Sequence, residues 1–502
     1  MSRLQRLNHT LIPGNPSIMK YAAAIATLAA TVFAKEIPKD PERAAELYDS
    51  GVMHERIMAD KNAQWDLQDQ MGVLNSLAGP QFPELPFAQC KNGLAAPLDP
   101  FQSNNASTKF RCNNINLHHF LSHTDLGSAV GKGSSSWGWV SDDGREFAII
   151  AQGDGAAFAE ITSAGKLRYL GRLPQTTGIA PSQWREIRTF KHYIVVGSEE
   201  PGHGVQIFDL KKLLTIDYKK GPVTFSPDTD LTGYWNDLPL GRVHNVLANS
   251  DSNFAYVVGA QPRNSSCLSG LIFLDLTDPS NPKNPGCARD DGYVHDAQCV
   301  IYKGPHKKYL GREICYGYNE DSITIYDVTD KQFPETISIT SYEGATYTHQ
   351  GWLLDVNNQE WLISDDEYDE VEGRGVASNG RPVTFIWDIR DLEHPKQTGY
   401  YQGPRKNIDH NQYIFGKYSY QSQYTAGLSI LDISSIPTDP TGRGVREVGW
   451  FDTYPEDDSL EGGGQLKFSG SWSNYAGYPS GFILINTMDR GAFVVKTQKP
   501  LP

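Results

Sequence analysis

Four histidines recur in one local pattern, in which a histidine is followed by a polar or small residue and a short apolar run. The strings are RVHNVL, YVHDAQ, YTHQGW and IDHNQY, with His244, His295, His349 and His410. Imidazole nitrogen is a preferred ligand of zinc, copper, iron and other first-row metals. If the repeats bring these side chains to one axis, we expect a site for a transition metal ion of undetermined identity. The alternative is a repeated histidine used for hydrogen bonding inside each unit.

Carboxylates stand in the loops that the same units would place beside the histidines. They are Glu199, Glu200, Glu320, Asp321, Asp365, Asp366 and Glu367. Such groups orient metal-bound histidines or accept protons, and we select Glu199 and Asp366 as candidate catalytic bases. The acidic run 364–373 has enough oxygens for calcium but lacks the spacing of an EF-hand loop, so we expect a solvated loop.

Tryptophan takes the place of histidine in three further copies of the pattern, SSWGWV, SQWREI and GSWSNY. These residues are Trp137, Trp184 and Trp472. Their rings are candidates for stacking on a sugar, and packing in the core is the alternative. Arg185 is a fourth ligand-binding candidate, for a carboxylate or phosphate group, unless it pairs with the nearby loop acids.

The seven anchors recur from Trp137 to Trp472 at the interval of a four-stranded unit, roughly 40–50 residues plus loops. This pattern predicts an all-β fold, a seven-bladed β-propeller over residues 112–502. Too few residues follow Trp472 for four strands. We therefore expect residues 114–123, NINLHHFLSH, to complete the last blade and close the ring. In most units an apolar strand ends in an aspartate that is expected to cap the next turn.

The N-terminal region has a different character. Residues 21–34 form an apolar run behind Lys20 that ends in small residues, which predicts a secretory signal over residues 1–34, with Met19 as a second possible start. A bilayer needs about 20 apolar residues, so we expect no transmembrane span. Residues 35–111 are predicted to be an appendage and connector, helical over about 40–72 and proline-rich over 80–100.

Six cysteines agree with an extracellular compartment, because an even number in a secreted chain predicts disulfides. Zinc is the alternative, but no pair has close C-x₂-C spacing. Asn105 and Asn264 begin N-glycosylation sequons. The pairs that we predict from proximity are Cys90 with Cys112, Cys267 with Cys287, and Cys299 with Cys315.

Composition and missing motifs limit the possible functions. The chain has 45 basic and 59 acidic residues, a formal charge of −14, which argues against nucleic-acid binding. We find no G-x-S-x-G elbow, H-E-x-x-H helix, phosphate loop or dinucleotide glycine pattern.

Several long strings, in order, carry a family resemblance: SSWGW, SQWREI, GHGVQIFDL, YVHDAQCVIYKGP, GREICYGYNEDSITIYDVTD, YTHQGWL, IDHNQY and GSWSNY. From about residue 112 to 495 the chain resembles the choice-of-anchor B family of LVIVD-repeat proteins, which includes fungal secreted relatives. The resemblance implies a seven-bladed β-propeller outside the cell or at its surface and implies no particular activity.

Two functional hypotheses follow. The first is a secreted binding or interaction module for a small molecule, a glycan or an extracellular protein, with the four histidines as a ligand or metal site. The second is a metal-dependent enzyme, a hydrolase, lyase or oxygenase, in which Glu199 or Asp366 moves the proton.

Overall fold

The computed structural model describes residues 35–72, 82–96 and 106–502. In these ranges the chain is mostly β, and its strands form seven largely antiparallel sheets. Among the described residues, no helix has the length and apolar character needed to cross a membrane. The predicted signal segment, residues 1–34, and Asn105 lie outside the described residues.

Each sheet has a core of strands that follow one another along the chain. The first sheet contains β6 (Gly133–Val140), β7 (Glu146–Gln152), β8 (Gly155–Ile161) and β9 (Leu167–Pro174), and β13 (Val223–Thr224) joins it. The second contains β10 (Arg185–Phe190), β11 (Tyr193–Ser198), β12 (Val205–Asp209) and β14 (Gly233–Trp235). The third contains β15 (Asn245–Asn249), β16 (Phe254–Val258), β17 (Leu271–Asp275) and β18 (Cys287–Ala288).

The fourth sheet contains β19 (Asp296–Ile301), β20 (Glu313–Tyr318), β21 (Ile323–Asp327) and β22 (Glu335–Tyr342), and β1 (Glu36–Ile37) joins it. The fifth contains β23 (Thr348–Leu353), β24 (Trp361–Asp366), β25 (Val383–Asp388) and β26 (Lys396–Gln402). The sixth contains β27 (Gln412–Phe415), β28 (Tyr418–Ser422), β29 (Leu428–Asp432) and β30 (Arg446–Phe451), extended by β4 (Phe110–Asn113), β3 (Leu94–Ala95) and β2 (Cys90–Lys91). The seventh contains β31 (Ser471–Tyr475), β32 (Ile483–Thr487), β33 (Gly491–Thr497) and β5 (Ile115–Ser122).

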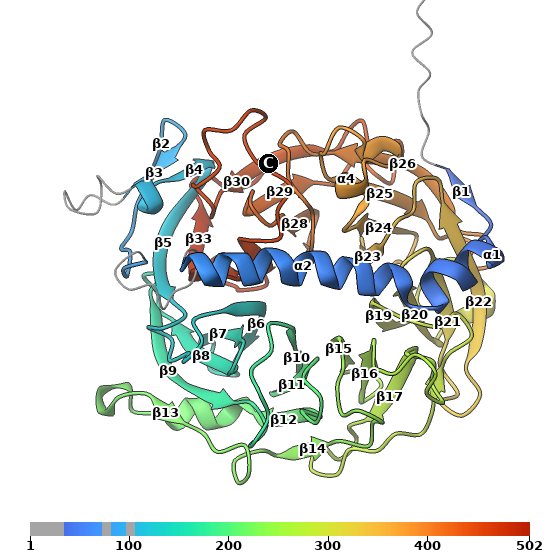
Figure 1. Ribbon diagram of the computed structural model, residues 1–502, viewed down its shortest axis with the longest axis horizontal. Helices are drawn as coiled ribbons and strands as arrows, with labels where there is room; N and C mark the ends of the chain where they lie inside the picture. The colour runs from blue at the N-terminus through green and yellow to red at the C-terminus, as the bar shows by residue number, and fades with distance from the viewer. Residues whose placement is uncertain (1–34, 73–81, 97–105) are drawn as a thin grey trace, which may run out of the picture. The chain divides into compact units, whose positions relative to one another are not determined.

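The first strands of successive sheets contact one another in chain order, and the contacts return from the last sheet to the first (Figure 1). The order is β6, β10, β15, β19, β23, β27, β31 and again β6. Inner strands such as β7 are buried along their whole length because neighbouring sheets cover both of their faces. Phe158 of the first sheet, for example, stacks on Phe208 of the second, with ring centroids 5.3 Å apart.

Strand β5 pairs antiparallel with β33, from Ile115 opposite Thr497 to Ser122 opposite Gly491. The sequence predicts this pairing between an early strand and the last sheet. The predicted turn caps are also present. Five strand-ending aspartates accept a hydrogen bond from the backbone N–H two residues later: Asp209, Asp275, Asp327, Asp388 and Asp432.

The described part of the appendage consists mainly of helix. It contains α1 (Pro41–Arg43), a π-helix over Ala44–Asp49 and α2 (Val52–Met71), and α2 runs across the first strands of several sheets (Figure 1). Its buried residues Ile57 and Trp65 pack in one apolar cluster with Trp184, Tyr347 and others. The remaining short helices are η3 (Ala106–Thr108), η4 (Leu210–Thr215), η5 (Tyr218–Lys220), η6 (Lys307–Tyr309), α4 (Asp369–Glu372) and η7 (Gly375–Ala377).

All three predicted disulfides are present, which confirms the local pairing of the cysteines. They join Cys90 to Cys112, Cys267 to Cys287, and Cys299 to Cys315. The last links β19 to β20, where the two cysteines are directly opposite. The first ties the β2–β3 hairpin to β4, which extends the sixth sheet.

Candidate metal centre

Four histidine side chains meet where the first strands of the third to sixth sheets begin. The backbone N–H groups of His244, His295 and His410 each donate to the carbonyl of the last residue of the second strand in their sheets. This shared hydrogen bond gives the three residues equivalent places. Successive imidazole centroids, from His244 through His295 and His349 to His410, are 4.2, 4.3 and 4.6 Å apart. The repeat pattern thus selects side chains that the fold brings together.

Each of the four imidazoles uses its Nδ1 atom to contact a neighbouring acceptor. The acceptors, in chain order of the histidines, are Glu199 Oε1 at 2.5 Å, the His349 carbonyl at 2.9 Å, Asp365 Oδ1 at 3.3 Å and the Trp472 carbonyl at 2.7 Å. An Nδ1–H that donates to an acceptor leaves Nε2 of a neutral ring with a lone pair. A hydrogen bond from the nitrogen that does not bind the metal is how proteins orient metal-binding histidines.

The tightest group of possible ligands contains two histidines and one glutamate. One ligand atom from each of His349, Glu367 and His410 lies within 4.8 Å of the others, and all three residues are buried. The Nε2 atoms of His349 and His410 are 3.9 and 3.6 Å from the carboxylate oxygens of Glu367. Two imidazole nitrogens and a carboxylate are a usual donor set for zinc and other first-row metals.

Protonation states in this group suit metal binding. Burial lowers the pKa values of His295 and His349 well below their usual range and that of His410 to about 4. Burial alone would raise the pKa of Glu367, but Lys61, His349 and His410 together lower it to about 2. Neutral imidazoles beside an ionised carboxylate are the forms that bind a metal ion.

Helix α2 covers the histidines. Lys61 Nζ lies 2.7 Å from both carboxylate oxygens of Glu367. Trp65 of the same helix packs on Trp184, with centroids 4.8 Å apart, and donates from Nε1 to the Phe468 carbonyl. The cavity that remains has about 10 Å³, room for one water or ion rather than an organic molecule. It is lined by Lys61, Trp184, Glu186, His244, Asn245, His295, His349, His410, Asn411 and Trp472.

Glu199 and Asp366, the two candidate bases, have different surroundings. Glu199 contacts His244 through one oxygen and Arg242 Nη2, at 2.6 Å, through the other. Asp366 instead accepts hydrogen bonds from the Thr346 and Tyr347 backbone N–H groups and from the Tyr342 hydroxyl. Asp366 therefore holds the turn before β23, and the neighbouring Glu367 is the carboxylate that faces the histidines.

The expectation of a solvated acidic loop over residues 364–373 is wrong. Asp365, Asp366, Glu367, Asp369 and Glu370 are all buried. The segment follows β24 into the region covered by α2, and Lys61 neutralises one of its carboxylates. These carboxylates are therefore part of the site and not of an exposed loop.

The four predicted ligand-binding residues do not form one site. Trp184 and Trp472 line the histidine cavity, and Trp472 Nε1 donates to Glu186 Oε1 at 2.8 Å. Arg185 is fully buried away from it, where Nε donates to the Gln152 carbonyl and Nη1 contacts His203 Nε2 at 2.6 Å. Burial lowers the pKa of Arg185 to about 10. Its hydrogen-bond partners are thus not the loop acids, and Nη2 has no hydrogen-bond partner among the described residues.

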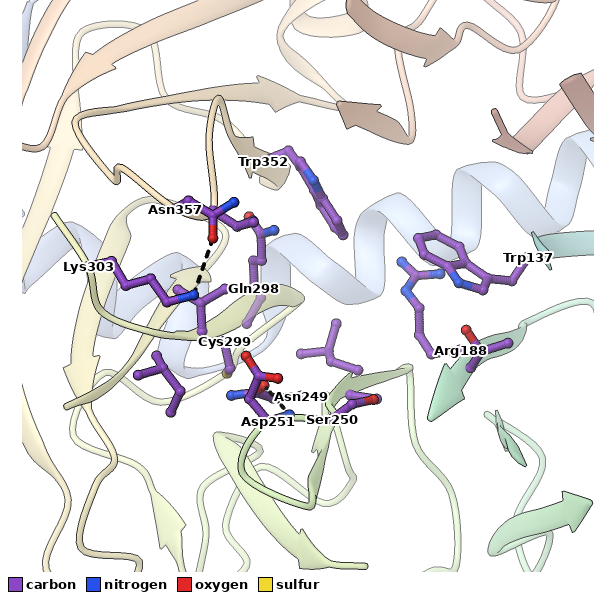
Figure 2. A pocket seen from close by; sticks show the side chains of 17 residues that line it. Trp137, Arg188, Asn249, Ser250, Asp251, Gln298, Cys299, Lys303, Trp352 and Asn357 are labelled. Atoms are coloured by element: carbon purple, nitrogen blue, oxygen red, sulfur yellow. Dashed lines mark hydrogen bonds between the residues drawn. The ribbon is translucent and has the colours of Figure 1, made fainter. Parts of the chain in front are cut away.

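Trp137 lies in a second cavity, which is lined by the later parts of the first strands (Figure 2). The guanidinium carbon of Arg188 is 4.4 Å from the centre of the Trp137 ring, and Tyr413 contacts the same ring edge-on at 4.9 Å. The Trp352 ring centroid is 6.4 Å from that of Trp137, and both rings line the cavity, which has about 330 Å³. Its aromatic and polar lining is typical of a small-molecule or sugar site.

A larger cleft of about 1050 Å³ lies beside the histidine cavity and shares Trp184 with it. His54 of α2, Glu199, Arg242 and Arg263 contribute to its lining. His54 Nδ1 contacts the Tyr347 hydroxyl at 2.7 Å, which fixes this part of α2 to the fifth sheet. Asn264 is exposed at the edge of this cleft, as a glycosylation sequon requires.

Sequence reasoning missed the contribution of α2. His54, Lys61, Trp65 and Gln68 are spaced by seven, four and three residues, so they share one helix face, and all are buried. Buried polar residues on one stripe of a helix are unusual and are the available signal of a functional contact. The sequence gives no sign of which loops the stripe meets.

No protein-family model and no curated protein sequence matches this chain. It is similar to the crystal structure of the computationally designed Ika8 protein, with 10% identity, a TM-score of 0.42, and coverage of 84% of this chain and 97% of that chain. It is also similar to the crystal structure of the Cps50 (Swd1) β-propeller domain of Myceliophteria thermophila, with 12% identity, a TM-score of 0.41, and coverage of 74% and 97%.

Proposed function

We propose that this chain is an extracellular seven-bladed β-propeller of the choice-of-anchor B type that serves as a binding or interaction module and holds one transition metal ion. Seven sheets whose first strands contact in a closed order support the blade count. The pairing of β5 with β33 supports closure of the ring by the N-terminal strand. Three disulfides support an oxidising, extracellular compartment.

The metal ion is held by His349, His410 and Glu367, with His295 beside them. The observation that carries this proposal is the mutual approach of the three ligand atoms within 4.8 Å. The outer acceptors that fix Nδ1 of His349 and His410 support it, because they leave Nε2 available. His349 and His410 line a cavity with room for one ion, and although Glu367 is not among the residues that line it, its oxygens are 3.6–3.9 Å from their Nε2 atoms.

An organic ligand fits the larger cavities better than the histidine cavity. The cavity at Trp137 and Trp352 suits a small molecule or sugar, whereas the two arginines of the larger cleft are already paired, Arg242 with Glu199 and Arg263 with Glu320. The ligand classes that we propose are therefore a small molecule, a glycan or a segment of an extracellular protein. In this function the metal organises the histidines and the module performs no turnover.

A metal-dependent hydrolase, lyase or oxygenase is the alternative, and one observation favours it. The cleft beside Trp184 reaches Glu199, whose carboxylate contacts His244 in the histidine row. Glu199 would then be the base that accepts a proton from the substrate or from water. This alternative needs α2 to shift, because Lys61 lies 2.7 Å from both oxygens of Glu367 and Trp65 packs on Trp184, which the cleft and the histidine cavity share.

Elemental analysis of the secreted protein, purified without chelator or affinity nickel, tests the proposal. We expect about one first-row metal per chain in the parent and loss of that metal in a folded His349→Ala/His410→Ala variant. His394→Ala is the matched control, because His394 is 75% exposed and pairs with Asp391 outside the site, and it should keep the metal. A parent without metal, or a double variant that retains it, would overturn the proposal.

A further inference from the structure

Three aspartates come together just after β30, in a segment that the histidine site does not use. One carboxylate oxygen from each of Asp452, Asp457 and Asp458 lies within 4.8 Å of the others. Asp452 and Asp457 are buried, and Asp458 is half-buried. The three residues lie on one short stretch that ends in the glycine-rich turn at 462–464.

The burial of Asp457 distinguishes this group from an acidic cluster on the surface. Its exposed fraction is 0%, and its carboxylate oxygens have no close hydrogen-bond partner among the described residues, although the Thr425 hydroxyl, which itself donates to the Gln465 carbonyl, is near enough to lower the pKa of Asp457. Asp458 Oδ1 likewise has no close hydrogen bond among the described residues and has only a long ion pair with Arg111. A buried charged carboxylate without a partner is costly, and proteins compensate such a group by protonation, a bound ion or a paired charge. Burial raises the pKa of Asp457 to about 7, so a bound cation would compete with a proton at this site.

Side-chain cations do not compensate the cluster fully. Arg111 Nη1 is 3.5 Å from Asp458 Oδ1, and its side chain is 39% exposed. Asp452 accepts the Tyr454 backbone N–H at 2.8 Å. No ion pair of Asp457 is found in the described part of the chain. Arg405 and Lys467 interact electrostatically with Asp452 and Asp457, respectively, and Glu456 adds another negative charge. Among the described residues, the buried oxygens of Asp457 therefore have no cation in direct contact.

We propose that Asp452, Asp457 and Asp458 bind one Ca²⁺ ion. Their donors are carboxylate oxygens without nitrogen or sulfur, which suit a hard cation rather than the transition metal proposed for the histidine site. Ca²⁺ accepts irregular sets of six to eight oxygens, so backbone carbonyls and water can complete its coordination.

This ion would stabilise the junction between the appendage and the sixth sheet. The Asp452 N–H donates to the Arg111 carbonyl at 2.9 Å, and Phe451 pairs with Cys112 across β30 and β4. Cys112 is in turn bonded to Cys90. Calcium at Asp452 therefore stabilises the contact through which β4 and its disulfide-linked hairpin join the sheet.

Calorimetric titration of EGTA-treated, dialysed full-length protein with CaCl₂ tests the proposal, together with thermal unfolding in EGTA and in Ca²⁺. We expect about one Ca²⁺ per chain and a higher Tm with Ca²⁺. Asp457→Asn should weaken Ca²⁺ binding at least tenfold and remove the Ca²⁺-dependent rise in Tm. In EGTA the same variant should unfold at a higher temperature than the parent, because an amide replaces a buried charge.

Three controls keep the result unambiguous. Glu461→Gln changes an exposed acid in the same loop and should bind Ca²⁺ like the parent. Asp458→Asn, at a half-buried position, provides a second ligand variant if Asp457→Asn folds poorly, and should also weaken binding. His349→Ala should leave Ca²⁺ binding intact, so this test is separate from that of the histidine site. A parent that does not bind Ca²⁺, or ligand variants that bind like the parent, would overturn the proposal.

Discussion

Lys61 Nζ lies 2.7 Å from each carboxylate oxygen of Glu367, and both side chains are buried. The two residues are 306 positions apart in the chain, so the pair connects the appendage helix with the histidine site. A positive charge thus already lies beside the carboxylate that we propose as a metal ligand. Metal binding and the docking of α2 must therefore influence each other.

Lys61→Met tests this coupling. Removing one partner of a buried ion pair costs about 3–5 kcal/mol, because it leaves the other charge without compensation. We expect the metal-free variant to unfold at a lower temperature than the metal-free parent. We also expect added Zn²⁺ to raise the Tm of the variant more than that of the parent, because the metal replaces the missing charge. Differential scanning fluorimetry with and without chelator measures both effects.

Arg56→Met is the control for this experiment. Arg56 is on the same helix and pairs with Glu372, but its side chain is 54% exposed. It should change the Tm little and leave the Zn²⁺ response as in the parent. A Zn²⁺ response that is equal in Lys61→Met and the parent would contradict the coupling.

The variants Glu367→Gln and Asp366→Ala distinguish the proposed metal ligand from the adjacent carboxylate. We expect at least tenfold weaker metal binding in a competition assay with a chromophoric chelator, because a neutral amide is a poorer ligand than a carboxylate. Asp366→Ala should instead keep the metal and lose stability, by about 1–3 kcal/mol, because it leaves the buried N–H groups of Thr346 and Tyr347 unpaired. The reverse pattern would assign the metal to Asp366.

The pH dependence of stability can be tested at Asp489, which is distant from the four histidines in the sequence. Burial raises its pKa to about 6, although Arg490 opposes this, and Oδ2 has no hydrogen-bond partner among the described residues. A folded pKa above the unfolded value of about 3.9 gives stability that is present below pH 4 and lost as the pH rises through 6.

Asp489→Asn keeps the oxygen that accepts the Gly470 N–H and removes the charge. We expect the variant to have a higher Tm than the parent at pH 8, and the difference to shrink as the pH falls to 4. Thermal unfolding followed by circular dichroism measures it, with the exposed Asp142→Asn as control. A difference that does not depend on pH would show that Asp489 is not the titrating group.

The bond between Cys299 and Cys315 closes a loop of 16 residues within the fourth sheet. By loop entropy, its removal should cost about 3 kcal/mol. We expect a Cys299→Ala/Cys315→Ala variant to lower the free energy of unfolding by about this amount, as measured in urea. A stability equal to that of the parent would show that the bond does not form in the purified protein.

The strand units and the histidine row could be read from the sequence because both are repeated, and repeated units occupy equivalent positions. Trp137 was aligned wrongly with the other anchors. It is inside β6, which begins at Gly133, whereas His244 and His295 directly precede their strands. The recurring sequence pattern matches residue types but does not show where each strand begins.

The different surroundings of Asp366 and Glu367 could not be predicted from the sequence. Adjacent residues at the end of a strand point to opposite sides, and nothing in the run of acids indicates which side faces the histidines. Lys61 could not be predicted at all, because its partner depends on where a separate helix docks. Local sequence patterns carry no information on a contact between such distant residues.

The most direct test of the central claim is X-ray diffraction from crystals of the chelator-free protein at the absorption edge of the metal found by elemental analysis. For zinc, we expect one anomalous peak within about 2.0–2.2 Å of the Nε2 atoms of His349 and His410 and of a Glu367 oxygen. A map without a peak among the four histidines, with Lys61 still bound to Glu367, would contradict it.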